Sequence, residues 1–294
     1  MDGQPVLRHN QGVAGWAETS DGRELFFQRR PGRPAGGEVP TVVFEGGLAA
    51  GRSYWATVQA EVAKWATSVV YDRSGLGRSP ADPGPRPLTR LAADLGALLD
   101  HLGPGPYLLV GHSWGGPIVR IAAAARPDRI AGLVLVDPTD EACELLFRPS
   151  TRRAERAGQV ISSVLARAGL LAAAHRGLLA SLPPDARADM CAEGFTTGVM
   201  RTRAAELASV VADLTGLRDQ PVDLPDVPLT VISAGRPSAS MNRRVRAEVD
   251  ASHAHRVRLS RQGRQVHAHR SGHMVQATEP DLIAAEIRRL AVGP

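Results

Sequence analysis

Cysteine and lysine are scarce in this sequence of 294 residues. Its two cysteines, Cys143 and Cys191, lie far apart and lack the spacing of metal ligands, so we interpret them as idle or buried thiols. Lys64 is the only lysine, and the arginines that carry the remaining positive charge are scattered along the whole chain. No zinc-finger, helix-turn-helix or RNA-binding pattern accompanies the net charge of +5, so we expect no nucleic-acid partner.

Long apolar runs are absent as well. No segment approaches the length of a membrane span, and residues 1–15 lack the basic start and apolar stretch of a secretory signal. We therefore expect no membrane span and a cytoplasmic location. Hydrophobic residues make up 43% of the chain and charged residues 22%, which is typical of a globular protein with a large core.

Residues 111–115 read Gly-His-Ser-Trp-Gly and stand between two different patterns. The apolar run 107–110 predicts a buried strand before them, and residues 117–125 predict a helix after them. A strand, a sharp turn on G-x-S-x-G and a helix are typical of a nucleophile elbow, in which a strained turn exposes the serine hydroxyl. The flanking glycines allow the strand and helix backbones to approach each other. Ser113 is therefore a candidate nucleophile.

Strand and helix patterns alternate through most of the chain. A hairpin around Asp21-Gly22 comes first, followed by apolar runs that predict strands at 41–44, 68–71, 107–110 and 133–136. Residues 88–102 predict an amphipathic helix with Thr89 as its N-cap and Gly103 as its end. Further strands are expected at 228–235 and 264–269, and the closing helix at 280–290. This alternation predicts an α/β fold with a mostly parallel central sheet flanked by helices.

Residues 141–225 differ from the rest, because they contain helical patterns and no run typical of a strand. We interpret this segment as a helical cap or lid, inserted after the sixth strand, that closes the pocket and selects the substrate. The core domain would then comprise residues 1–140 and 226–294. A helical excursion that lies away from the site is the alternative.

Four residues fall at the carboxyl ends of predicted parallel strands, where ligands bind in such sheets: Gly47, Asp72, Ser113 and Asp137. A glycine backbone at such an end can approach a ligand closely and aim its N–H group at it, so Gly47 is a candidate donor to an oxyanion. Asp72 precedes a tight turn that contains two glycines. We interpret it as a residue that holds this turn.

A serine nucleophile needs a base, and His273 is the strongest candidate among nine histidines. It follows the last predicted strand in a glycine-containing loop that returns to the sheet edge. His112 is expected to point away from the neighbouring serine, and His267 and His269 to lie on a face of the last strand. The remaining five stand in terminal or helical contexts and are predicted at the surface: His9, His101, His175, His253 and His255.

These motifs resemble the α/β-hydrolase fold family over nearly the whole chain. The resemblance is carried by Phe-Glu-Gly-Gly at 44–47, by residues 71–79, by residues 111–116 and by Ser-Gly-His at 271–273. It implies Ser113 as the nucleophile, His273 as the base, and the N–H groups of Gly47 and Trp114 as the oxyanion hole. Leu48 and Met274, their neighbours, are expected to bind substrate. A serine at the elbow argues against dehalogenases and epoxide hydrolases, which use aspartate.

The sequence departs from the family pattern in two places. Glu45 stands where many members carry histidine, and the loop after the strand at 229–234 holds no carboxylate to serve as the triad acid. Some members take the acid from the preceding strand, and Asp137 occupies that place. Asp140 and Asp250 remain alternatives, as does a serine–histidine pair without an acid.

We expect a serine hydrolase that cleaves an ester-type acyl bond of a small molecule, with no metal and no organic cofactor. The same residues would serve a thioesterase, a C–C hydrolase or an acyltransferase. A receptor that binds a ligand without turnover is the alternative from another class, and an intact serine–histidine pair weighs against it.

Overall fold

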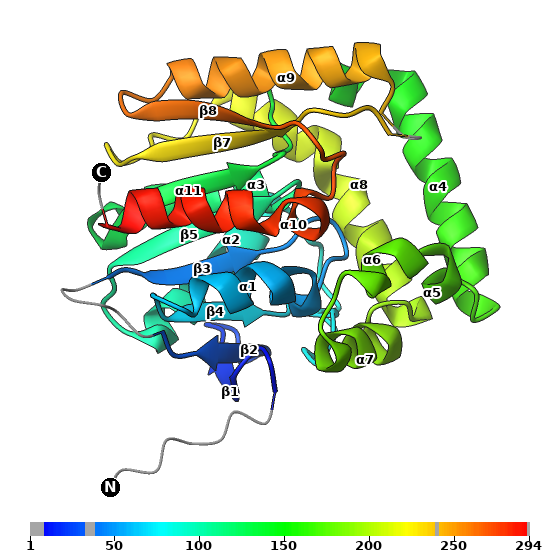
Figure 1. Cartoon of the computed structure of the whole chain (residues 1–294). Helices are drawn as coiled ribbons and strands as arrows, with labels where there is room; N and C mark the ends of the chain where they lie inside the picture. Colours follow the sequence, from blue (N-terminus) through cyan, green and yellow to red (C-terminus); the bar gives the residue numbers. More distant parts are fainter. Residues whose placement is uncertain (1–8, 33–38, 239–240, 293–294) are drawn as a thin grey trace, which may run out of the picture.

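An eight-stranded sheet runs through the computed structural model, which describes residues 9–32, 39–238 and 241–292 (Figure 1). Its strands are β1 (Val13–Glu18), β2 (Glu24–Arg30), β3 (Thr41–Glu45), β4 (Ser68–Tyr71), β5 (Tyr107–His112), β6 (Ile130–Val136), β7 (Leu229–Ala234) and β8 (Gly263–Ala268). Their spatial order is β1-β2-β4-β3-β5-β6-β7-β8. The β1–β2 and β2–β4 pairs are antiparallel, and the pairs from β4 through β3 to β8 are parallel. The predicted α/β fold with a mostly parallel sheet is confirmed.

Two helical layers cover the sheet. Alternate residues of each buried strand point to opposite faces, so both faces are apolar and each is covered by helices. On β5, Leu109 packs in the cluster that contains α2 (Leu88–Leu102) and α3 (Gly115–Ala124). Leu108 and Val110 pack in the cluster on the other face, with α1 (Ala56–Val62) and α11 (Pro280–Val292). Figure 1 shows α1 and α11 side by side on this second face.

The chain between β6 and β7 forms helices, which lie beside the carboxyl ends of the parallel strands (Figure 1). They are η3 (Glu144–Phe147), α4 (Pro149–Arg167), α5 (Leu171–Ala174), α6 (Arg176–Ala180), α7 (Pro184–Glu193) and α8 (Thr197–Asp219). Their apolar side chains form a small core with those of the loops after β3 and β4, including Ala49 and Leu76. Within the described ranges, no helix is long and apolar enough to cross a membrane.

The start of α2 differs from its prediction. Thr89 is not its N-cap: the helix is preceded by Pro87, and no side chain of that residue caps it. Instead, the N–H of Leu88 donates to Oδ2 of Asp213 on α8, at 3.1 Å. A carboxylate from a distant helix therefore satisfies a donor that a local cap would otherwise take. Gly103 does end the helix, with φ of 109°.

Three short helices and the longer α9 complete the description. The single-turn helix η1 (Arg52–Trp55) leads into α1, and η2 (Pro127–Arg129) leads into β6. Between β7 and β8 lies α9 (Arg243–Arg258), and α10 (Val275–Thr278) follows the loop after β8. His269, predicted within the last strand, lies just beyond the end of β8.

Candidate active site

Ser113 lies in a strained turn between β5 and α3. Its φ is +52°, which is unfavourable for a residue with a side chain and therefore needs support from its surroundings. That support requires close packing of the backbone. A Cβ on Gly111 would lie 2.5 Å from the carbonyl oxygen of Gly115, and a Cβ on Gly115 would lie 2.6 Å from that of Glu45. A side chain at either position would clash with the backbone, so the turn requires glycine at both.

Three loops at the carboxyl edge of the sheet bring Ser113, His273 and Asp137 together. His273 Nε2 lies 3.0 Å from Oγ of Ser113, and its Nδ1 lies 2.6 Å from Oδ2 of Asp137. With the carboxylate accepting the Nδ1 proton, Nε2 is free to accept the proton of the serine hydroxyl. The arrangement has the order of groups that activates a serine nucleophile.

Asp137 is buried at the end of β6 and is held from several sides. Its Oδ1 accepts from the N–H of Ala234 at 3.0 Å and from Nη1 of Arg246 on α9 at 2.5 Å. Burial opposes its ionisation, but the hydrogen bond from His273 and the charges of His273, His253 and Arg246 together hold the pKa of Asp137 well below its usual range. Its φ of +42° again indicates a backbone shaped by its neighbours.

The two alternative acids lie elsewhere. Asp140 pairs with Arg256, whose Nε lies 2.7 Å from Oδ2. Asp250 lies 2.9 Å from Nε2 of His267 on the last strand. Neither hydrogen-bonds to His273 in the part of the chain that the structure describes. The geometry therefore favours Asp137.

The loop after β3 passes beside the elbow. A Cβ on Gly47 would lie 3.2 Å from Cβ of Ser113, so the backbone of Gly47 lies next to the candidate nucleophile. Trp114, which follows the serine, is the residue before the first turn of α3. Within the described ranges, neither the Gly47 nor the Trp114 amide donates a hydrogen bond to another group of the protein. Both amides are thus available to an oxyanion.

The two predicted substrate-binding residues flank this site. Leu48 follows Gly47 and is half-buried against the core cluster around α2 and α3. Met274 follows His273, and its Sδ lies 3.9 Å from Nε2 of Gln276. Their contact with substrate stays a prediction.

His112 contacts the candidate base, a role that the sequence did not indicate. The ring of His112 lies 4.7 Å from that of His273 between centroids, and its Nε2 lies 2.9 Å from the carbonyl oxygen of His273. It therefore holds the loop that carries the candidate base. Burial, with a smaller contribution from the charge of His273, lowers the pKa of His112 to about 3.

His253, predicted at the surface, is completely buried, so that prediction is wrong. One ring nitrogen lies 2.8 Å from Oγ of Ser233 and the other 2.9 Å from the carbonyl oxygen of Pro138. Arg246, His253 and Arg256 recur on α9 at intervals of seven and three residues and are all buried. This spacing places the three side chains on one face of the helix. Because the face is polar, the hydrophobic periodicity of the sequence did not reveal that it is buried.

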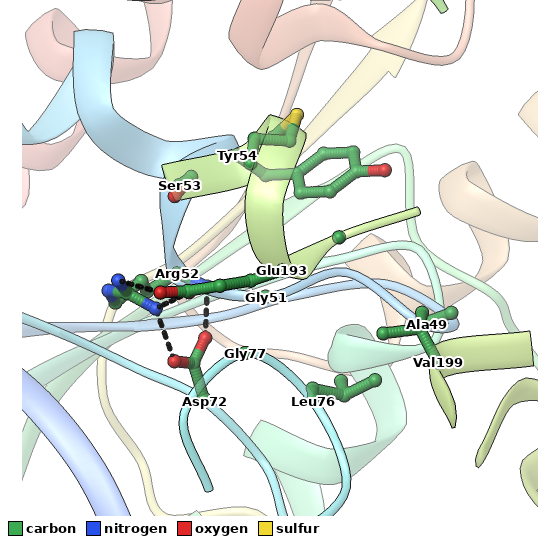
Figure 2. Close-up of a pocket in the computed structure, with 12 residues that line it drawn as sticks. Ala49, Gly51, Arg52, Ser53, Tyr54, Asp72, Leu76, Gly77, Glu193 and Val199 are labelled. Atoms are coloured by element: carbon green, nitrogen blue, oxygen red, sulfur yellow. Dashed lines mark hydrogen bonds and ion pairs between the residues drawn. The ribbon is translucent and has the colours of Figure 1, made fainter. Parts of the chain in front are cut away.

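Asp72 lies at the carboxyl end of β4 and holds the loops around it. Its carboxylate accepts from the backbone N–H groups of Arg52 and Arg78 and from Nη1 of Arg52. Figure 2 shows Arg52 between Asp72 and Glu193 of α7, which accepts from the same guanidinium at 2.6 Å. Asp72 thus ties the core loops to the helices between β6 and β7 and does not contact Ser113.

We also searched the described residues for side chains that could bind a metal ion. Among the residues that the structure describes, no three His, Cys, Asp or Glu side chains converge in a way that could hold an ion.

Comparison with known proteins agrees with the topology. Residues 40–156 match the family model of the alpha/beta hydrolase fold. The mostly parallel eight-stranded sheet agrees with this match, and the chain has the α/β-hydrolase fold. An AB hydrolase superfamily protein of Gibberella zeae is 25% identical over 303 aligned residues, which cover 91% of each chain.

Closer similarity is confined to shorter segments. Lipase LipV of Mycobacterium tuberculosis is 49% identical over 67 residues, or 23% of this chain and 25% of the lipase. The chain therefore matches only about a quarter of that relative's length. Among solved structures, an esterase of Thermogutta terrifontis superimposes with a TM-score of 0.68 at 20% identity, covering 95% of this chain and 97% of the esterase. At that identity the likeness concerns the fold.

Proposed function

We propose that this protein is a serine hydrolase that cleaves an ester-type acyl bond of a small organic substrate. The observation that carries the proposal is the chain of hydrogen bonds from Ser113 through His273 to Asp137 at the carboxyl edge of the sheet. The names of two similar proteins, a lipase and an esterase, support the same reaction class. No metal or organic cofactor is required for this chemistry.

In the proposed reaction, His273 Nε2 removes the hydroxyl proton while Oγ of Ser113 attacks the carbonyl carbon of the substrate. The tetrahedral intermediate carries its negative charge on the former carbonyl oxygen, which accepts from the N–H groups of Gly47 and Trp114. His273 then gives its proton to the leaving alcohol, and the acyl group stays on Ser113. Water then attacks the acyl carbon while the same histidine takes its proton. As this second intermediate breaks down, His273 returns the proton to Oγ of Ser113 and the acid leaves. Asp137 holds the ring and stabilises its protonated form throughout.

We further propose that residues 141–225 act as a cap over a core of residues 1–140 and 226–294. Contacts between the two parts support this role. Besides the Arg52–Glu193 pair, Thr202 of α8 donates to the carbonyl oxygen of Gly75 at 3.0 Å, and the N–H of Ala49 donates to Glu206 at 3.3 Å. Helices held at this edge are placed to exclude water and to select substrates.

A fluorophosphonate probe tests the proposal without knowledge of the substrate, because it reacts with an activated serine. We expect the wild-type protein to be labelled and Ser113→Ala to remain unlabelled. Ser233→Ala is the matched control, since Ser233 also lies against a histidine ring, 2.8 Å from Nδ1 of His253, but is buried on β7. Its labelling should equal that of the wild type. An unlabelled wild type, or labelling that persists in Ser113→Ala, would overturn the proposal.

A further inference from the structure

Arg73 is a buried cation that contacts the backbone of the loop next to Ser113. Its Nη1 donates to the carbonyl oxygen of Gly46 at 2.9 Å, and its Nη2 donates to that of Gly47 at 2.7 Å. The side chain is only 1% exposed, so water does not compete for these bonds. One guanidinium thus binds two successive carbonyl groups of the loop.

The first of these bonds bears on the Gly47 amide. The carbonyl of Gly46 and the N–H of Gly47 belong to one planar peptide unit and point in opposite directions. A donor that fixes the carbonyl therefore fixes the direction of the N–H. Hydrogen bonds along such a unit also polarise one another, so a cation at the carbonyl strengthens the N–H as a donor.

Two backbone N–H groups of the same loop also make hydrogen bonds: that of Ala50 donates to the carbonyl oxygen of Gly47 at 3.1 Å, and that of Ala49 donates to Glu206 at 3.3 Å. Gly46 and Gly47 carry no side chains, and the space around them accepts none. A Cβ on Gly46 would lie 2.5 Å from the carbonyl oxygen of Ala50, and one on Gly47 would lie 3.2 Å from Nδ1 of His112. Two adjacent glycines are also the residues with the greatest conformational freedom in the unfolded chain. Neither of these two hydrogen bonds reaches the carbonyl of Gly46, which accepts from Arg73.

Two carboxylates hold Arg73 in turn. Glu45 accepts from Nη1 at 2.5 Å, and Glu206 of α8 accepts from Nε and Nη2, both at 3.0 Å. Glu45 also accepts from the hydroxyl of Tyr71, and Glu206 from Arg86 at 3.1 Å. Two arginines and two glutamates are thus paired within this buried cluster. Glu45, one of the two departures from the family pattern in the sequence, is thus a partner of Arg73.

We propose that Arg73 is the positioning residue of the oxyanion hole, and that Glu206 links this hole to helix α8. The inference rests on the proposed serine hydrolase function. Arg73 does not touch the substrate. It orients and polarises the Gly47 amide, which acts on the tetrahedral intermediate and hardly at all on the ground-state carbonyl.

The test compares Arg73→Lys with Arg86→Lys. Lysine keeps the positive charge but lacks the planar fork that binds two carbonyl oxygens and two carboxylates at once. Arg86 binds the same Glu206 without reaching the loop, so its replacement disturbs the same cluster and leaves the clamp of Arg73 on the loop intact. The two variants separate positioning of the loop from general loss of stability.

For Arg73→Lys we expect kcat on a p-nitrophenyl ester to fall by about 10- to 100-fold, with KM nearly unchanged. The affinity for a trifluoromethyl ketone, whose adduct with serine carries an oxyanion, should fall by a similar factor. The pH at which activity is half-maximal should stay the same, because the histidine and its acid are untouched. Arg86→Lys should retain kcat and inhibitor affinity within about threefold.

Equal kinetics in the two variants, or a change confined to Tm, would overturn the inference. If Arg73→Lys fails to fold, the pair Arg73→Gln with Glu45→Gln removes the clamp with balanced charge and keeps the Glu206–Arg86 pair, and the same loss of kcat is expected. An unlabelled wild-type protein in the fluorophosphonate experiment would instead refute the proposed function. The two failures are thus distinguishable.

Discussion

Arg246 donates to one carboxylate oxygen of Asp137 at 2.5 Å, while the other oxygen accepts from His273 at 2.6 Å. The acid of the proposed triad therefore lies between two cationic partners once His273 is protonated. A fixed positive charge at this distance weakens the attraction of the carboxylate for a second one. Arg246 thus bears on the pH dependence of the proposed reaction.

Replacing Arg246 by methionine should move the acidic limb of the pH profile of kcat/KM to higher pH. The reason is that Asp137, freed of the arginine, stabilises the protonated histidine more strongly, and a protonated histidine cannot act as the base. Arg244→Met, which removes an exposed arginine from the same helix, is the control. A limb that shifts equally in both variants, or in neither, would contradict this account.

Asp137→Asn should lower kcat by about 10³- to 10⁴-fold, because an amide at this position favours the wrong tautomer of the histidine. Asp140→Asn and Asp250→Asn serve as matched controls. The first breaks a buried pair with Arg256 and should reduce the free energy of unfolding with little effect on kcat. The second removes an exposed partner of His267 and should change neither. Near-normal turnover in Asp137→Asn would exclude it as the triad acid.

His112 should make the folded protein sensitive to mild acid. Its pKa is about 3 in the folded state, against an ordinary value of 6.5, so only the unfolded chain takes up the proton as the pH falls below about 6.5. The free energy of unfolding therefore falls with pH across this window, by at most about 1.4 kcal/mol per unit for this group. Carboxylates with lowered pKa values add their own loss only below about pH 4.5.

Urea denaturation between pH 4.5 and 7.5 measures this slope in the wild type and in His112→Gln. We expect a shallower slope in the variant, though not a flat one, because burial also lowers the pKa of His253. His255→Gln removes an exposed histidine and controls for the loss of one ring. An unchanged slope in His112→Gln would mean that His112 takes up its proton without unfolding.

Local patterns of the sequence were enough to predict much of this molecule. The elbow around Ser113 follows from glycine spacing and from an apolar run that changes to a helical period. The carboxyl ends of parallel strands necessarily meet at one sheet edge, which brings Ser113 and Asp137 into the same region before any contact is known. These features depend on residues close together in the chain, and periodicity reports such residues directly.

Other features were decided by contacts between distant segments. The selection of Asp137 over Asp140 and Asp250 depends on which carboxylate meets His273, 136 residues further along the chain. The burial of His253 and the clamp of Arg73 on the Gly46–Gly47 peptide likewise depend on how helices dock on the sheet edge. A polar side chain carries no periodic signal of its partner, because the partner is set by tertiary packing. The sequence determined where the candidate nucleophile Ser113 stands, and only the folded structure decided which charges surround it.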